Sequence, residues 1–522
     1  MSQHRLHLAG RAAIVAMLFM AVATSAETPL EPTVEKPRPR PPAAAKPSPH
    51  PLTLQDAIHR ALQHNLALAA ARLSPHQAAT VVVEERAAFD PAAFGEFNRR
   101  KANQQARSAL FGEREQNGDA AFGLRKRFPL GTEAEAFYGL EKDWNDAPFA
   151  TTNPAYRQGH GAQFVQPLLK GFGIRVNTAA IATARNDQRI ALAALHDAAL
   201  QTIAETVRMY WELAYAHGNR TFLLDSLERT RNLQRDIEAR VRAEVLGGRD
   251  PSVAQAAAGV AVAQEAVISA DDAIRDVEDS LKVLTDLGAD DVLWGAPLMP
   301  TTPPPTPTPT LDLQRALLIA LDKRPDYRQI KITLENDDIQ LHVTRHDLLP
   351  RLDLTARAAS AGLADDWHGA GHHARSLDFY DLSVGLVFEY PLGNRAATAR
   401  RRRASLRRQQ DHLRLKFLER QIQRQVREAV RQVGTDTERL RAATLSVRAQ
   451  QERLRAENIR LKEANVGTSQ DVLDAVAALA SAQSRRLRAL VDLNTAVMET
   501  ERAQGTLLEA HGVTITDTPR PR

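Results

Sequence analysis

The feature that most constrains this chain is a short strand that runs directly into a very long helix. Between Phe379 and Leu392, large apolar residues alternate with small or polar ones until Pro391 ends the run. Alternation with a period of two predicts a β-strand with one apolar face. From Asn394 to Val466 there is no proline and one glycine, Gly434, which predicts a helix of about 70 residues and about 105 Å. No compact globular domain holds such a helix, so the strand is expected to continue into a helical tube.

The strand also has the length that a tilted strand needs to cross a bilayer, which is about 9 to 11 residues. Tyr380 and Tyr390 lie near its two ends. Aromatic side chains gather at both membrane interfaces of transmembrane β-barrels. We therefore take Tyr380 and Tyr390 as candidate membrane-girdle residues.

Residues 1–26 have the pattern of a cleavable signal peptide. Arg5 and Arg11 precede an apolar run from Ala12 to Ala23, which is followed by small residues. No other run reaches about 18 apolar residues, so we expect no membrane-spanning helix and insertion by strands alone. The chain has no cysteine, which excludes disulfides, thiol catalysis and lipid attachment to an N-terminal cysteine.

Composition and motifs argue against an enzyme and against a nucleic-acid partner. The formal net charge is only +5 over 522 residues, which is too small to call for a nucleic-acid partner. The sequence lacks the zinc-protease, serine-hydrolase and phosphate-loop signatures. We expect no catalytic residue, no cofactor and no metal, so any transport must be driven by a partner.

Proline-rich segments predict how the chain is divided. Residues 27–51 are expected to form a leader and residues 298–310 a linker between a first repeat, 52–297, and a second repeat, 311–510, with a C-terminal tail at 511–522. Thr53 and Asp312 are matching helix-start residues. The spacing of the residues around them recurs: Leu52, Leu54, Gln55, Ala57, Ala61 and Leu62 match Leu311, Leu313, Gln314, Ala316, Ala320 and Leu321.

Each half predicts a helix pair, strands, a very long helix, a tight turn and a returning helix. The turns are expected at Gly247 and Gly248 in the first half and at Gly467 in the second. The returning helices are rich in alanine, which lets helices pack closely. Between Ala120 and Leu140 an additional hairpin is indicated, which either lengthens an outer loop or changes the number of strands.

The duplicated start at Leu52 and Leu311, the sequence Arg324-Pro325-Asp326 and the segment from Gly467 to Ala475 resemble the TolC family of outer-membrane efflux proteins over about residues 52–510. The resemblance implies a mixed α/β, mostly α fold. It implies a homotrimer in the cell outer membrane, in which each protomer gives about four strands to one transmembrane β-barrel. A long α-helical barrel would continue it into the periplasm.

The same resemblance implies a channel-tunnel of a tripartite efflux or type I secretion system. Export through it would be passive and driven by an inner-membrane pump or exporter, with a periplasmic adaptor protein and outer-membrane lipid as further partners. Two alternatives compete. A periplasmic adaptor should show one helical hairpin flanked by β-rich domains, and a structural coiled-coil protein would not need the alternating strand. The exported substrate, whether small compound, metal ion or polypeptide, is left open.

Three charged groups each have a functional and a simpler interpretation. Asp471 and Asp474 resemble the acidic residues that ring the periplasmic mouth in the family, and the alternative is helix capping. His368, His372 and His373 could bind a metal, but a solvated loop between two strands is favoured. Arg400 to Arg403 are interpreted as a solvated collar, with contact to lipid headgroups as the alternative.

Overall fold

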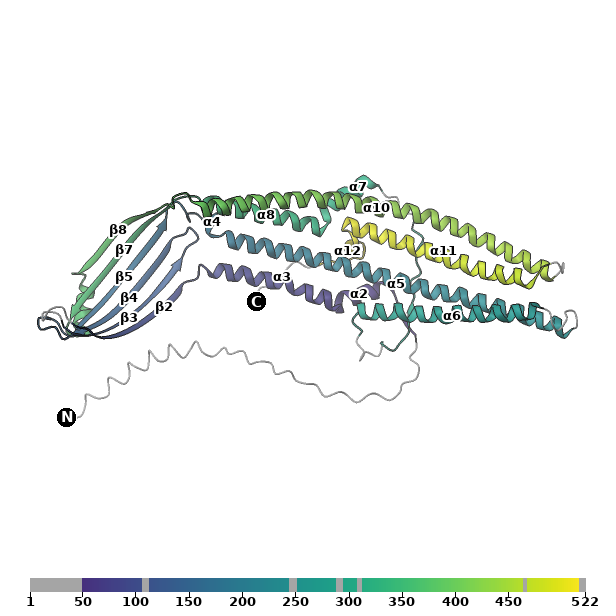
Figure 1. Cartoon of the computed structure of the whole chain (residues 1–522), viewed down its shortest axis with the longest axis horizontal. Coiled ribbons are helices and arrows are strands. Elements are labelled where there is room, and N and C mark those ends of the chain that lie inside the picture. The colour runs from purple at the N-terminus through teal and green to yellow at the C-terminus, as the bar shows by residue number, and fades with distance from the viewer. Residues whose placement is uncertain are drawn as a thin grey trace, which may run out of the picture. The chain divides into compact units, whose positions relative to one another are not determined.

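Two matched series of helices and strands follow each other along the chain (Figure 1). The computed structural model describes residues 49–105, 112–243, 251–287, 294–307, 312–462 and 467–515. The predicted signal peptide, most of the predicted leader and the predicted turn at Gly247 and Gly248 lie outside these residues.

The first series contains helices α2 and α3, four strands, the short helix α4 and the helical hairpin α5–α6. Their bounds are α2 (Leu54–His64), α3 (Leu66–Ala87), β2 (Ala92–Asn103), β3 (Arg114–Arg127), β4 (Glu133–Asn145), β5 (Ala155–Pro167), α4 (Ile174–Asn177), α5 (Ala179–Arg242) and α6 (Pro251–Leu284).

The second series has a similar order, with fewer strands, the extra helices α9 and α12 and no described counterpart of α4. Its elements are α7 (Leu313–Lys323), α8 (Pro325–His346), β7 (Arg351–Ala364), α9 (Trp367–Ser376), β8 (Tyr380–Glu389), α10 (Arg395–Lys462), α11 (Ser469–Gln504) and α12 (Leu507–Ala510). Helices α2 and α7 each have 11 residues, and α3 and α8 each have 22.

The predicted helix starts and the predicted long helix are confirmed. Thr53 Oγ1 accepts a hydrogen bond from Asp56 N at 3.1 Å, and Asp312 Oδ1 accepts one from Gln314 N at 2.9 Å. Each side chain thus satisfies a backbone N–H that has no partner inside the helix. Helix α10 runs without interruption for 68 residues, and α5 runs for 64.

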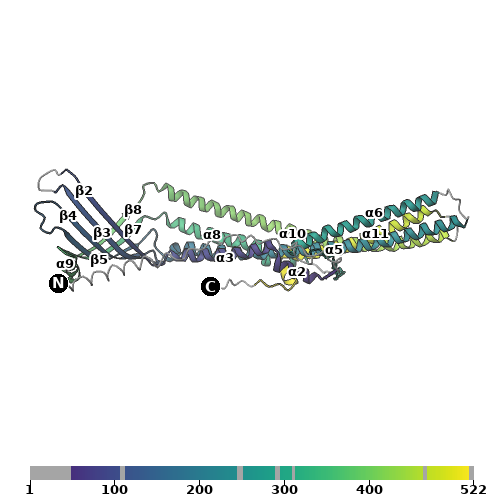
Figure 2. The ribbon, with the colours of Figure 1, turned by 90° about the horizontal axis from the view of Figure 1, so that it is seen from below.

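The main sheet corrects the expectation of about four strands. In the described part of the chain it contains six antiparallel strands in the order β2-β3-β4-β5-β7-β8. The hairpin expected between Ala120 and Leu140 supplies the two additional ones, β3 and β4. Figure 2 shows the sheet at one end of the long helices.

The β3–β4 turn is bound to the junction between β5 and α5, at the helical end of the sheet. Leu130 O accepts a hydrogen bond from Gly173 N at 3.0 Å, and an Arg127 guanidinium nitrogen donates to Asn177 Oδ1 at 3.0 Å. Gly131 has a φ of +101°, and a Cβ there would lie 2.5 Å from Gly171 O. These contacts join residues about 40 positions apart. Local alternation can therefore predict the hairpin, but it cannot show that the hairpin belongs to the main sheet.

A small parallel sheet joins the end of the predicted leader to the start of the predicted linker. Strands β1 (His50–Leu52) and β6 (Leu298–Pro300) pair beside helix α5. The hydroxyl of Tyr210 donates to Leu52 O at 3.1 Å and accepts from Thr302 N at 2.9 Å. Tyr210 is fully buried, so these proline-rich segments are anchored to the middle of α5.

The largest core lies around the middle of α5, where it contacts α2, α11 and α12. Ile203, Tyr210 and Leu213 are fully buried there. Towards the far ends of the helices a second cluster combines leucine, isoleucine and valine side chains with alanines, of which Ala256, Ala475 and Ala482 are fully buried. Small residues allow close helix packing, as the alanine-rich sequence predicted.

Among the described residues, one helix, α6, is long and apolar enough by composition to cross a membrane. It contains no continuous apolar run of the length that the sequence prediction required. Its apolar window is interrupted by Gln255, Gln264 and Glu265. Length and composition alone do not place a helix in a membrane, and α6 packs along α5.

Two buried carboxyl groups meet between α8 and α10. Asp337 is 5% exposed and Asp411 is 1% exposed. Burial, with a smaller contribution from Asp411, raises the pKa of Asp337 to about 6. Arg407 Nε lies 3.4 Å from Asp337 Oδ1, and Arg414 lies 2.7 Å from Asp411.

We predict that Asp337 makes stability depend on pH. Because the folded protein holds a proton at Asp337 more tightly than the unfolded chain, this contribution is complete below about pH 4 and is lost as the pH rises through about 6. The loss should be about 1 to 2 kcal/mol after solvent screening. Thermal unfolding of Asp337→Asn in detergent should lack this part of the decline between pH 4 and pH 7. Asp338→Asn, which removes the neighbouring exposed carboxylate, should keep it, and an identical pH profile for both variants would contradict the assignment.

Candidate functional site

The six-stranded sheet has one apolar face that nothing in the described chain covers along its β8 edge. Cross-strand pairing places Leu124 beside Ala136, and Leu354 beside Leu386, on this face. The β8 side chains that carry the predicted alternation, Leu382, Val384, Leu386 and Phe388, are between 66% and 79% exposed. A contiguous apolar surface of this kind requires a lipid or protein partner.

The opposite face of the sheet is polar and carries ion pairs. Arg125 lies 2.9 Å from Glu135, and Arg157 lies 3.1 Å from Glu141. Near the helical end, Arg351 lies 2.6 Å from Asp353. Apolar and polar residues alternate along a strand in this way when one face of the sheet contacts lipid and the other contacts water.

Both edges of the sheet are unpaired in the described chain. Strand β2 pairs only with β3, and strand β8 pairs only with β7. Each edge therefore presents backbone N–H and C=O groups that need a partner. Tyr380 begins β8 and is 69% exposed, while Tyr390 follows it and is 46% exposed. Their role in a membrane girdle stays a prediction.

The start of α11 holds the two predicted gate residues. Asp471 forms a capping box: Thr468 Oγ1 accepts from Asp471 N at 3.2 Å, and Asp471 Oδ2 accepts from Thr468 N at 3.1 Å. The Thr468 hydroxyl also donates to Asp471 Oδ2 at 2.6 Å, and this hydrogen bond, followed by the one from Thr468 N, lowers the pKa of Asp471. Asp474 is exposed and accepts from Gln470 Nε2 at 2.8 Å. Asp471 therefore has the capping function that was its simpler interpretation, and a gate role for both residues stays a prediction.

Gly467 lets the chain turn tightly after α10. A Cβ at this position would lie 3.2 Å from Leu461 N and 3.3 Å from Arg460 Cβ, closer than most side chains tolerate. Residues 463–466 of the same turn lie outside the described residues, as does the matching turn at Gly247 and Gly248.

The histidine-containing segment was expected to be a glycine-rich loop, and this was wrong for most of its length. It forms helix α9, whose start is capped by Asp366 Oδ1 accepting from Gly369 N at 2.6 Å. Ala370, Gly371 and Ala374 are buried against the sheet. Glycines lower helix propensity, and packing against the sheet outweighs this here.

Histidines 368, 372 and 373 lie on α9, and the Nδ1 of His373 is 3.0 Å from Leu363 O. No group of three or more potential metal ligands that could hold an ion is found in the described residues. Arg400, which opens the predicted collar, lies 3.7 Å from Asp347 at the end of α8.

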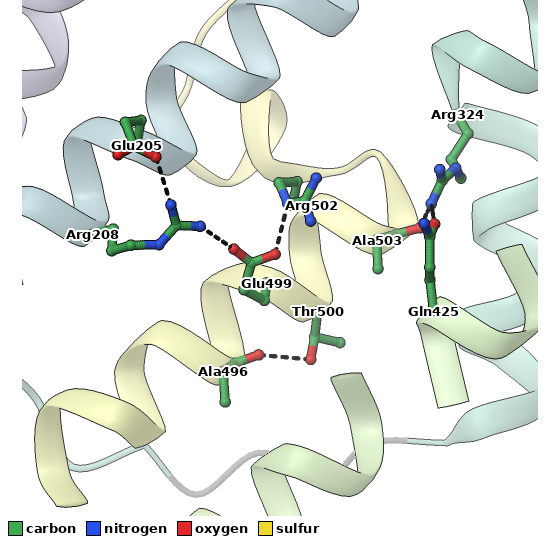
Figure 3. A network of polar contacts seen from close by, with 9 residues as sticks. All are labelled: Glu205, Arg208, Arg324, Gln425, Ala496, Glu499, Thr500, Arg502 and Ala503. Carbon is green, nitrogen blue, oxygen red and sulfur yellow. Dashed lines mark hydrogen bonds and ion pairs between the residues drawn. The ribbon is translucent and has the colours of Figure 1, made fainter. Parts of the chain in front are cut away.

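A polar network in the middle of the helices was not identified as a site from the sequence (Figure 3). Glu499 on α11 accepts from Arg208 on α5 at 2.7 Å and from Arg502 at 2.6 Å. Arg324, at the start of α8, donates to Gln425 on α10 at 2.9 Å and to Ala503 O at 3.2 Å. The sequence Arg324-Pro325-Asp326 was the available signal for this junction, because proline begins a helix and arginine forms several directed hydrogen bonds.

Comparison with solved structures identifies the fold. The outer-membrane channel OprN superposes with a TM-score of 0.65 at 18% identity, covering 87% of this chain and 90% of that chain. The chain has the fold of the TolC-type outer-membrane channels. The CmeC outer-membrane channel of Campylobacter jejuni gives a TM-score of 0.63 at 17% identity, covering 87% of this chain and 86% of that chain.

A membrane protein from Pseudomonas aeruginosa gives a TM-score of 0.66 at 17% identity, covering 90% of this chain and 99% of that chain. No protein-family model and no curated protein matches the sequence. The superposition on these solved structures confirms, through the fold, the TolC-type resemblance seen in the sequence.

We predict that Thr468→Ala loosens the start of α11. Removing an N-cap hydroxyl costs about 1 kcal/mol, so amide hydrogen exchange over residues 469–472 should become faster. Gln470→Ala keeps the capping box and serves as the control. Unchanged protection in Thr468→Ala would show that the turn does not depend on this cap.

Proposed function

We propose that this chain forms an outer-membrane channel that continues into the periplasm as a helical tunnel. The observation that carries the proposal is a sheet with one apolar face, one polar face and two unpaired edges, joined to long helices in the fold of outer-membrane channels. A lipid environment leaves no water to bond the edge groups, so the edges must be closed by strands.

Closure follows if β8 of one copy pairs with β2 of the next. Such a head-to-tail contact generates a closed ring when the rotation between copies fits. The implied homotrimer has three copies, and each described sheet has six strands. The ring would therefore contain eighteen strands. Barrels of about 16 to 18 strands enclose an aqueous channel. The polar face would line this channel and the apolar face would contact lipid.

The direction of the strands orients the channel. The chain enters β2 from α3 and leaves β8 towards α10, so both connections lie at the helical end. That end would face the periplasm, and α9 at the opposite end would face the cell exterior. Helical hairpins α5–α6 and α10–α11 would extend the tunnel towards an adaptor protein and an inner-membrane pump or exporter, which would supply the energy for passive export.

The channel proposal accounts for features that the alternatives do not. A periplasmic adaptor is expected to have one helical hairpin, whereas the described chain contains two. A structural coiled-coil protein would not need a two-faced sheet. The channel role is supported by OprN and CmeC, both outer-membrane channels that share the fold.

We predict that the β3–β4 hairpin sets the size of the barrel. Strands β2 and β5 are antiparallel, so joining Asn103 to Ala155 and removing residues 104–154 allows β2 to pair directly with β5. Electron microscopy of the purified protein should show eighteen strands for the full chain. Three sheets of four strands give twelve for the deletion variant, with a narrower outer mouth.

A full-length barrel of twelve strands, with the hairpin outside it, would contradict this assignment. A monomer that remains without a closed barrel in detergent and in lipid would contradict the channel proposal itself.

We predict that Asp471 and Asp474 favour cations at the periplasmic mouth. Three copies would bring six carboxylates together, and closely held like charges favour bound cations. Asp471→Asn with Asp474→Asn should weaken cation selectivity and block by divalent ions in planar bilayers. Asparagine keeps an acceptor for the helix cap, so stability should change by only about 0.5 kcal/mol. Glu265→Gln with Asp272→Asn removes the same charge from the exposed face of α6 and should leave both properties unchanged. Equal selectivity and divalent block in the parent and the gate variant would rule out a gate role.

A further inference from the structure

We propose that the apolar face of the sheet carries a site for a phosphate-bearing lipid of the outer leaflet. The site lies on β2, β3 and β4 at the end of the sheet away from the helices. The proposal rests on the proposed function, because that function places this face against the membrane.

Two cations flank an open floor on this face. Register pairs Arg99 with Gly118 and Gly118 with Lys142, so the three positions form one cross-strand row. Neighbouring strands are about 4.8 Å apart, which separates the two cationic positions by about 10 Å. A Cβ on Gly118 would meet only Asn98 O, at 4.0 Å, so the space between the cations is open.

The next row towards the helices is apolar. Phe97 pairs with Ala120, and Ala120 pairs with Leu140. Phe97 is 74% exposed. These residues line one groove with Arg99, Lys142, Trp144 and Trp367. Cationic groups thus lie towards the outer end and apolar groups towards the membrane interior, the order in which a lipid presents its phosphate and its acyl chains.

Helix α9 supplies a fixed wall of this groove. The ring of Trp367 packs edge-on against Tyr156 with centroids 4.7 Å apart, and Gln158 Nε2 donates to Trp367 O at 2.5 Å. Gly362 permits the close approach of the helix, since a Cβ there would lie 2.2 Å from Ala370 O. Lys142 Nζ lies 5.0 Å from the centroid of the Tyr156 ring, which holds the ammonium group beside this wall.

The nearby carboxylates do not neutralise the two cations. Asp119 and Glu141 alternate onto the opposite face, where Asp119 accepts from Asn98 at 3.0 Å and Glu141 pairs with Arg157. Among the described residues, neither Arg99 nor Lys142 has an ion-pair partner. A phosphate can accept hydrogen bonds from both side chains, and the apolar row beneath favours a lipid over a free anion.

The test is native mass spectrometry of the purified full-length protein in detergent, titrated with diphosphoryl lipid A. Arg99→Gln with Lys142→Gln should bind the lipid about tenfold more weakly. Gly118→Leu should also weaken binding, because it fills the floor and leaves both charges in place. Arg100→Gln with Arg357→Gln removes equal charge from the opposite face and should bind as the parent does.

Dephosphorylated lipid A should bind weakly, and millimolar inorganic phosphate should not displace the bound lipid. Parent-like binding by the double variant, equal binding of the dephosphorylated lipid, or full displacement by inorganic phosphate would each overturn the proposal. The same spectra show how many copies each particle contains. Trimers that bind no lipid would overturn only the lipid site. Monomers under every condition would overturn the proposed function.

Discussion

The structure depends on one constraint, which is that the backbone groups at the edges of a membrane-length sheet need partners. The described chain pairs six strands internally and leaves β2 and β8 each with one open side. The apolar face is uncovered along β8. A single copy therefore exposes a large apolar surface as well as the unpaired backbone N–H and C=O groups of β2 and β8. The proposed closed ring of copies in lipid would satisfy both requirements at once.

The strands are held in register by the junctions where they meet the helices. Asn177, near the start of α5, donates from Nδ2 to Gly171 O at 2.8 Å, and Asn394, before α10, donates to Leu348 O at 3.2 Å. The β3–β4 turn binds the first of these junctions, which makes the additional hairpin part of the sheet and widens the proposed barrel.

The helices are joined differently along their length. Large side chains and the network of Arg208, Arg324 and Glu499 connect α5, α10 and α11 in the middle. Nearer the tips, a second cluster combines alanines with larger side chains such as Leu233, Ile237 and Leu454. The start of α11 is fixed there by the Thr468 and Asp471 cap. The capping hydrogen bonds use one side of Asp471, whereas Asp474 remains exposed, so Asp474 is better placed than Asp471 to contribute charge to a mouth.

The sequence by itself determined the features that arise from neighbouring residues. Period-two alternation identified β8, the absence of proline identified α10, and Thr53 and Asp312 marked helix starts. The tertiary structure decided that β3 and β4 enter the sheet, that α9 replaces a loop, and that Arg99 and Lys142 share one row across Gly118. These outcomes depend on pairing and packing between residues distant in sequence, which local propensity and periodicity do not encode.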